Sequence, residues 1–126
     1  MPQKKRQLAI IDSVQISPGR GRAAGQTICE LQMIITIGEE RGQRIVKRYY
    51  FDRDLPDALK QDFLRLGMLA SEIGDLERSK SELVGRIARL SLVTDEDGKL
   101  RIFVEDYIGS DDPRKYYPQK KIDDRM

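Results

Sequence analysis

The stretch TICELQMIITIG, from Thr27 to Gly38, decides how the rest of the chain is interpreted. Its apolar and polar side chains alternate, and a period of two residues is that of a β-strand, whose successive side chains point to opposite faces of a sheet. We therefore predict a strand over Thr27–Gly38. Its apolar face carries Cys29, Leu31, Met33, Ile35 and Ile37.

Two further strand-like stretches flank this one, Leu8–Ser17 before it and Gln43–Asp52 after it. In the first of them Asp12 interrupts the apolar face, which predicts a β-bulge or a bend at that residue. That apolar face holds Leu8, Ile10, Val14 and Ile16. Together the three stretches predict an antiparallel meander.

The third strand has two faces of similar composition. Tyr49 and Phe51 share one parity, whereas Tyr50 shares the other with Arg44 and Arg48. We predict that Tyr49 and Phe51 are buried and that Tyr50 points outward. A shift of one residue in register would exchange the two tyrosines, and the sequence leaves that alternative open.

The second half of the chain adds a helix and a closing hairpin. Apolar residues at helical spacing predict a helix over Asp57–Ile73. A capping box, Ser79-x-x-Glu82, predicts one short turn after it. Strands over Val84–Thr94 and Lys99–Ile108 follow, joined by the turn signal Asp97-Gly98.

Three strands, one helix and two strands is the element order of an OB-fold. We therefore predict a mainly β domain with one helix over residues 8–109, built as an OB-fold-like five-stranded antiparallel barrel. We expect disorder in the basic residues 1–7 and in the tail 110–126, neither of which has a clear hydrophobic periodicity.

Length and composition are those of one small domain. The 126 residues carry a net charge of +2, but residues 1–53 hold ten Lys/Arg and five Asp/Glu, so the positive charge is concentrated in the meander and would attract a polyanion. No apolar run reaches the roughly 20 residues that span a bilayer, so we expect no membrane partner. A single cysteine allows no intramolecular disulfide, from which we expect a cytoplasmic protein.

The residues that most often carry out catalysis are missing or unfavourably placed. The chain has no histidine, and Cys29 falls on an apolar strand face, where it packs as a small hydrophobe. The loop Gly19–Ala24 matches G-x-G-x-x-A, but a strand follows it where a dinucleotide site needs a helix. The acids of Asp95–Gly98 are explained more simply by a hairpin turn than by a metal site. We therefore predict neither an enzyme nor a resident cofactor or metal.

Cationic and aromatic residues in the meander predict a binding surface. The loop Pro18–Gln26 is rich in glycine and carries two arginines without an acid, which suits a phosphate backbone. The third strand places cations beside aromatic rings, the combination by which proteins bind single strands. We predict six nucleic-acid-binding residues: Arg20, Arg22, Arg44, Lys47, Arg48 and Tyr50.

Several segments, taken in order, resemble a phage- and plasmid-associated family of small single-stranded-DNA-binding proteins with an OB-like fold. The resemblance spans roughly Leu8–Ile108. Its segments are LAIIDS at Leu8–Ser13, Leu31–Gly38, GQRI at Gly42–Ile45, YYF at Tyr49–Phe51 and ELVGR at Glu82–Arg86. The resemblance implies a role in DNA replication, recombination or repair.

We therefore expect non-catalytic binding of single-stranded DNA or RNA through the arginine-glycine loop and the basic, aromatic strand face. Replication or recombination proteins and a second copy of the chain are further expected partners. The alternative is a protein-interaction domain of the same fold, for example a phage structural or adaptor subunit, that binds no nucleic acid. Fold alone does not separate the two.

Overall fold

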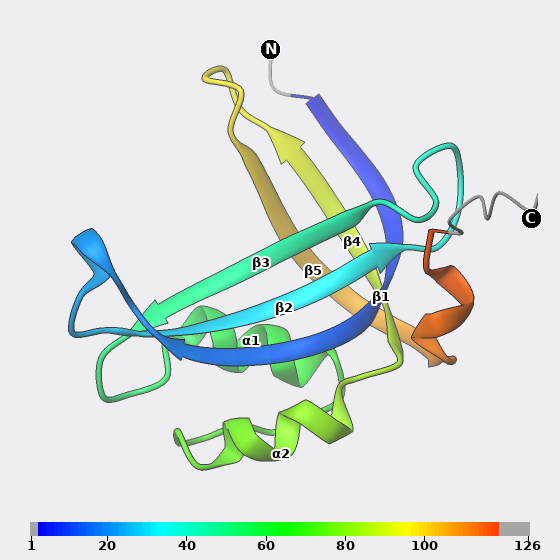
Figure 1. The fold of residues 1–126 in the computed structure, drawn as a ribbon. Helices are drawn as coiled ribbons and strands as arrows, with labels where there is room; N and C mark the ends of the chain where they lie inside the picture. The colour runs from blue at the N-terminus through cyan, green and yellow to red at the C-terminus, as the bar shows by residue number, and fades with distance from the viewer. Residues whose placement is uncertain (1–2, 119–126) are drawn as a thin grey trace, which may run out of the picture.

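The computed structural model describes residues 3–118, in which five antiparallel strands form one open sheet in the order β3-β2-β1-β4-β5 (Figure 1). The elements are β1 Gln3–Pro18, β2 Thr27–Ile35, β3 Arg44–Phe51, α1 Asp57–Arg65, α2 Asp75–Glu82, β4 Arg86–Thr94 and β5 Leu100–Ser110, with short 3-10 helices η1 Gly21–Ala23 and η2 Pro113–Tyr116. The prediction of a mainly β, antiparallel architecture is confirmed. Residues 3–118 contain two α-helices where one was predicted.

Strand β1 belongs to both halves of the sheet. Its residues Gln3–Ile10 pair with β4, and Ala9–Pro18 pair with β2. The ladder with β2 shifts register between Ile11 and Ser13, so Asp12 lies in a bulge, as predicted. Figure 1 shows the strand curving strongly between its two partners.

The bulge changes which side chains of β1 face the core. Ala9 and Ile11 belong to the core before the bulge, and Val14 belongs to it after the bulge. Ile10 is also fully buried, but it lies outside this core and opposite Ile34, which is buried in the same way. The predicted face, which grouped Ile10 with Val14, is therefore wrong, because one extra residue inverts the alternation.

Helix α1 packs beneath the curved sheet in the view of Figure 1 and completes the core. Leu59 and Phe63 are fully buried. The ring of Phe63 meets that of Tyr49 edge to face, with the ring centroids 6.3 Å apart and the planes at 89°. Such a pair adds about 0.5–1.5 kcal/mol of stability beyond that from burying the two rings. The contact with α1 therefore favours the orientation of β3 in which Tyr49 points into the core.

The first helix ends earlier than predicted. Gly67 adopts a φ of 90°, and the N–H of Met68 donates to the carbonyl of Phe63 at 2.8 Å, which is a Schellman helix end. The φ of 90° strains any other residue, and a Cβ at Gly67 would also lie 2.6 Å from the ring of Tyr107, so the position favours glycine. Helix α2 then takes the place of the predicted single turn. Neither α1 nor α2, the two α-helices of residues 3–118, is long and apolar enough to cross a membrane.

Both ends of the described chain contact the sheet. Residues 3–7 pair with β4, and η2 lies against β1 and β2. The hydroxyl of Tyr117 donates to the carboxylate of Asp12 at 2.7 Å. The expectation of disorder is therefore wrong for residues 3–7 and 110–118, because backbone pairing and side-chain contacts hold them. Residues 119–126 of the predicted tail lie outside the described residues.

Candidate nucleic-acid interface

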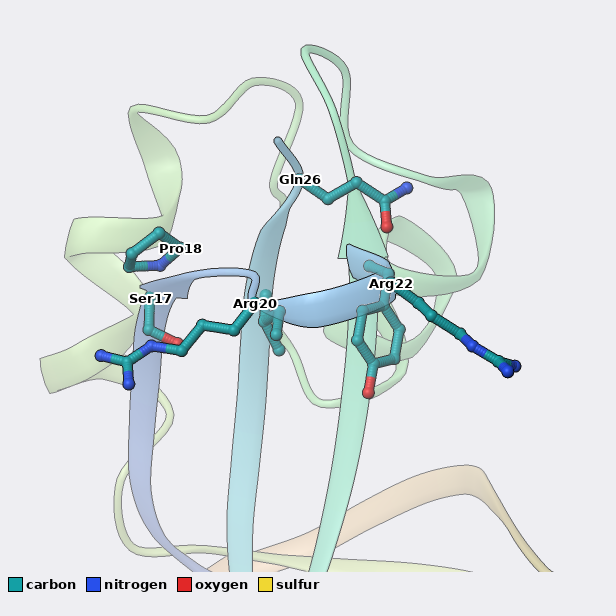
Figure 2. Close-up of a pocket in the computed structure, with 7 residues that line it drawn as sticks. Ser17, Pro18, Arg20, Arg22 and Gln26 are labelled. Carbon is teal, nitrogen blue, oxygen red and sulfur yellow. The ribbon is translucent and has the colours of Figure 1, made fainter. Parts of the chain in front are cut away.

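The connection between β1 and β2 displays two arginines. The N–H of Gly19 donates to the carbonyl of Gln26 at 2.7 Å, which closes the loop, and Gly21 adopts a φ of 60° at the turn. Arg20 and Arg22 are exposed, and neither forms an ion pair with another residue between 3 and 118. Figure 2 shows their side chains pointing away from each other, so they can contact two different phosphates.

Tyr50 presents an exposed ring beside this loop. It lies opposite Ile28 in the β2–β3 ladder, and 50% of it is exposed. Its neighbours Tyr49 and Phe51 are only 4% and 5% exposed. The predicted register is therefore confirmed, and the alternative with Tyr49 outward is excluded.

An open hollow with a volume of about 710 Å³ brings the loop and the strand together (Figure 2). Its lining residues are Ser17, Pro18, Arg20, Arg22, Gln26, Ile28 and Tyr50. Three of the six predicted binding residues, Arg20, Arg22 and Tyr50, therefore share one surface. Pro18 and Gln26 belong to the predicted loop Pro18–Gln26, whereas Ser17 and Ile28 were not predicted. Ile28 could have been found, because it shares the outward parity of β2 and faces the ladder position of Tyr50.

Arg44 and Arg48 share the outward face of β3 with Tyr50, but an acid holds each of them. A guanidinium nitrogen of Arg48 lies 2.8 Å from the carboxylate of Glu30, and one of Arg44 lies 2.9 Å from that of Asp12. About half of each arginine side chain is exposed (51% and 49%), whereas the side chains of Glu30 and Asp12 are only 17% and 12% exposed, so each pair joins a surface cation to a largely covered acid. A phosphate would compete with an acid for both arginines.

Lys47 lies apart from that outward face. Its Nζ is 2.8 Å from the carboxylate of Asp62 in α1, and the hydroxyl of Tyr49 donates to the same carboxylate at 2.5 Å. Asp62 is only 4% exposed, so Lys47 neutralises a buried charge. Successive residues of a strand face opposite sides, which separates Lys47 from Arg48 although the two are adjacent in the chain.

Burial raises the pKa values of two groups in the core, Cys29 and Tyr49. Burial, together with the charge of Glu30, raises the pKa of the Cys29 thiol to about 12. Burial, followed by the negative charge of Asp62, raises the pKa of Tyr49 above its ordinary value. Neither group is an effective nucleophile near neutral pH. In the part of the chain that the structure describes, no three His, Cys, Asp or Glu side chains gather as metal ligands.

The acidic connection between β4 and β5 is a hairpin turn, as predicted. The carboxylate of Asp95 accepts hydrogen bonds from the backbone N–H groups of Asp97 and Lys99, at 3.0 and 2.9 Å. Gly98 adopts a φ of 82°, which glycine reaches without steric cost. The first acid of the turn therefore has a structural role.

Comparisons with known proteins give no relative from which a role could be transferred. No protein-family model, no curated protein and no solved structure matches this chain.

Proposed function

We propose that the protein binds single-stranded nucleic acid, without catalysis, in the hollow formed by Arg20, Arg22 and Tyr50. The observation that carries the proposal is that two arginines without an acidic partner among the described residues and one half-exposed ring line the same open hollow. Guanidinium groups bind phosphate oxygens through charge-assisted hydrogen bonds, and an exposed aromatic ring stacks on an unpaired base. The hollow therefore offers phosphate contacts and a base-stacking surface next to each other.

The arrangement of the strands supports the same function. We propose an OB-type barrel, because β1 pairs with both β2 and β4, all neighbours are antiparallel, and the helices lie between β3 and β4 in the chain. Barrels of this type commonly bind oligonucleotides on the face of strands two and three and on the loop between strands one and two. The hollow lies where that loop meets β2 and β3.

We propose DNA as the ligand, in replication, recombination or repair, on the resemblance of the quoted sequence segments to the phage- and plasmid-associated family. Nothing in the hollow itself selects deoxyribose over ribose. A half-exposed tyrosine favours a single strand over a duplex, because a paired base has no free face on which the ring could stack.

The test is a titration of fluorescently labelled oligothymidylate and of a duplex of the same length, followed by anisotropy over a range of salt concentrations. We expect the single strand to bind more tightly and its affinity to fall with salt, with a log–log slope of about −0.7 for each phosphate contact. Absence of binding at low salt, or equal affinity for the duplex, would contradict the proposal.

A second candidate function is a protein-interaction module, the alternative named from the sequence. The ion pairs of Arg48 with Glu30 and of Arg44 with Asp12 favour it, because they lower the net positive charge of the outward face of β3. The same titration separates the two functions, since a pure protein-interaction module would leave the oligonucleotide unbound at every salt concentration.

A further inference from the structure

The two edges of the open sheet, β3 and β5, lie near each other without being hydrogen-bonded neighbours. Between them is a second open hollow, with a volume of about 360 Å³. Strand β3 contributes Val46, Lys47 and Arg48 to its lining, and strand β5 contributes Leu100, Arg101, Ile102 and Phe103. The hollow is therefore a slot with cationic side chains from both edges and apolar side chains between them.

Phe103 is the aromatic ring of this slot. It is 48% exposed and does not belong to the core, whereas the next residue along β5, Val104, is buried in the core. The Nζ of Lys47 lies 5.9 Å from the centroid of the Phe103 ring. A half-exposed ring with cations beside it combines an apolar stacking surface with positive charge, as does the first hollow around Tyr50.

Arg48 connects the two hollows. It shares the outward face of β3 with Tyr50, two residues away, and it also lines the slot beside Phe103. Its ion pair with Glu30 and the 3.8 Å pair of Arg101 with Asp95 lie at the surface, with the two arginine side chains 51% and 66% exposed. Both guanidinium groups are exposed enough for a phosphate to reach them, where it would compete with Glu30 and Asp95 for their N–H groups.

We propose that the slot between β3 and β5 is a second base-binding subsite, in which Phe103 stacks on a base of the same strand that occupies the Tyr50 hollow. This inference rests on the proposed function. A strand that leaves Tyr50 passes Arg48 and enters the slot, where Arg101 lies on the far edge. The acidic turn that follows β4 repels phosphate and limits how far the strand extends along β5.

The test uses the absence of tryptophan from the sequence. In Phe103→Trp and Tyr50→Trp the introduced indole is the sole tryptophan, and stacking on thymine quenches its fluorescence. The probes are oligothymidylates of about 4 and about 12 nucleotides, close to the ends of the range that single domains of this type bind. We expect the longer probe to quench both variants and the shorter probe to quench Tyr50→Trp more strongly, because it cannot fill both hollows.

Affinity measurements provide the second readout. Phe103→Leu keeps the bulk of an apolar side chain but loses the ring, so the longer probe should bind on the order of 5- to 100-fold more weakly, the usual range for one base–aromatic stack. Binding of the shorter probe should be nearly unchanged. Ile108→Ala is the matched control, because Ile108 is exposed on β5 but does not line the slot. Thermal melts of all variants identify any loss of folding.

The outcomes separate this inference from the proposed function. Quenching in Tyr50→Trp without quenching in Phe103→Trp, together with full affinity of Phe103→Leu for the longer probe, overturns the second subsite and leaves the proposed function standing. If neither indole is quenched and no probe binds, both proposals fail.

Discussion

The hydroxyl of Tyr117 donates a hydrogen bond to the carboxylate of Asp12, 2.7 Å away and 105 residues earlier in the chain. The other oxygen of that carboxylate pairs with Arg44 at 2.9 Å, and the Arg44 guanidinium lies 5.4 Å from the centroid of the Tyr117 ring. The three side chains connect the C-terminal segment, the bulge of β1 and the start of β3. The segment after β5 is thus part of the folded unit.

Deletion of residues 111–126 should destabilise the protein. It removes η2 from β1 and β2, and with it the hydrogen bond that Tyr117 donates to Asp12. We expect the free energy of unfolding to fall by about 1.5–3 kcal/mol, the usual worth of one hydrogen bond to a charged group. Urea titration measures it. A chain ending at Pro118 keeps these contacts and is the control; equal stability of the two truncated chains would show that η2 contributes nothing.

Replacement of both Arg20 and Arg22 by alanine should weaken binding while leaving the melting temperature nearly unchanged. Both side chains are exposed in a loop, and no residue between 3 and 118 forms an ion pair with either. The salt dependence should flatten by about 0.7 in log–log slope for each phosphate that the variant no longer neutralises. The single variant Lys99→Ala, which removes an exposed cation at the β4–β5 turn, is the control. A large fall in melting temperature of the double variant would indicate that the loop packs as structure.

Tyr50 and Phe51 are adjacent residues whose substitution should have opposite effects. Tyr50→Ala removes a half-exposed ring, so we expect a loss of about 1–3 kcal/mol in binding free energy and little change in stability. Phe51→Ala truncates a buried ring and should cost about 3–5 kcal/mol of folding free energy. Denaturant titration and oligonucleotide titration of both variants measure these effects. If Tyr50→Ala binds like the unmodified protein, the hollow is not the site.

The stability of the protein should decrease in alkali through Cys29. The folded-state pKa of this thiol is about 12, against 9.0 for an unperturbed cysteine. Below pH 9 both states hold the proton and the contribution is complete. Between pH 9 and about 12 the unfolded chain loses the proton and the folded chain keeps it, so the free energy of unfolding falls.

Urea titrations at several pH values from 7 to about 11 test this, with Cys29→Val as the control because valine fills a similar space without a titratable group. The control should lose less stability above pH 9. Tyr49, whose pKa is also raised, adds a loss above pH 10 that both proteins share. Identical pH profiles of the two proteins would mean that the thiol is not the source.

The sequence predicted all five strands and the orientation of β3, because apolar alternation and the pairing of Tyr49 with Phe51 are local signals. It also located the bulge at Asp12, since a regular strand would bury that carboxylate among apolar side chains. The prediction nevertheless kept one parity through the bulge, because Ile10 and Ile11 are both apolar and the sequence does not show which of the two faces the core. The helix end at Gly67 was missed, since an apolar stripe continues beyond the glycine in the sequence.

Part of the candidate site could also be predicted from the sequence. Arg20 and Arg22 were predicted from the composition of their loop, and Tyr50 from its parity in the third strand. The acid that holds Arg44 could not be assigned, since Asp12 lies in the bulge of β1 and meets the arginine only after the sheet forms. Phe103 has no distinctive sequence signal. The role that we propose for it rests on the slot that β3 and β5 form together, which the sequence does not show.

The double role of β1 has a consequence for the order in which the protein assembles. Its C-terminal part pairs with β2, so the meander can form once residue 51 has emerged from the ribosome. Its N-terminal part, Gln3–Ile10, must wait for β4 at Arg86–Thr94. Domains dominated by such distant pairings fold in milliseconds to seconds rather than microseconds. During that interval Lys4, Lys5 and Arg6 lie on an unpaired strand, where their charge opposes pairing with the edge of another nascent chain.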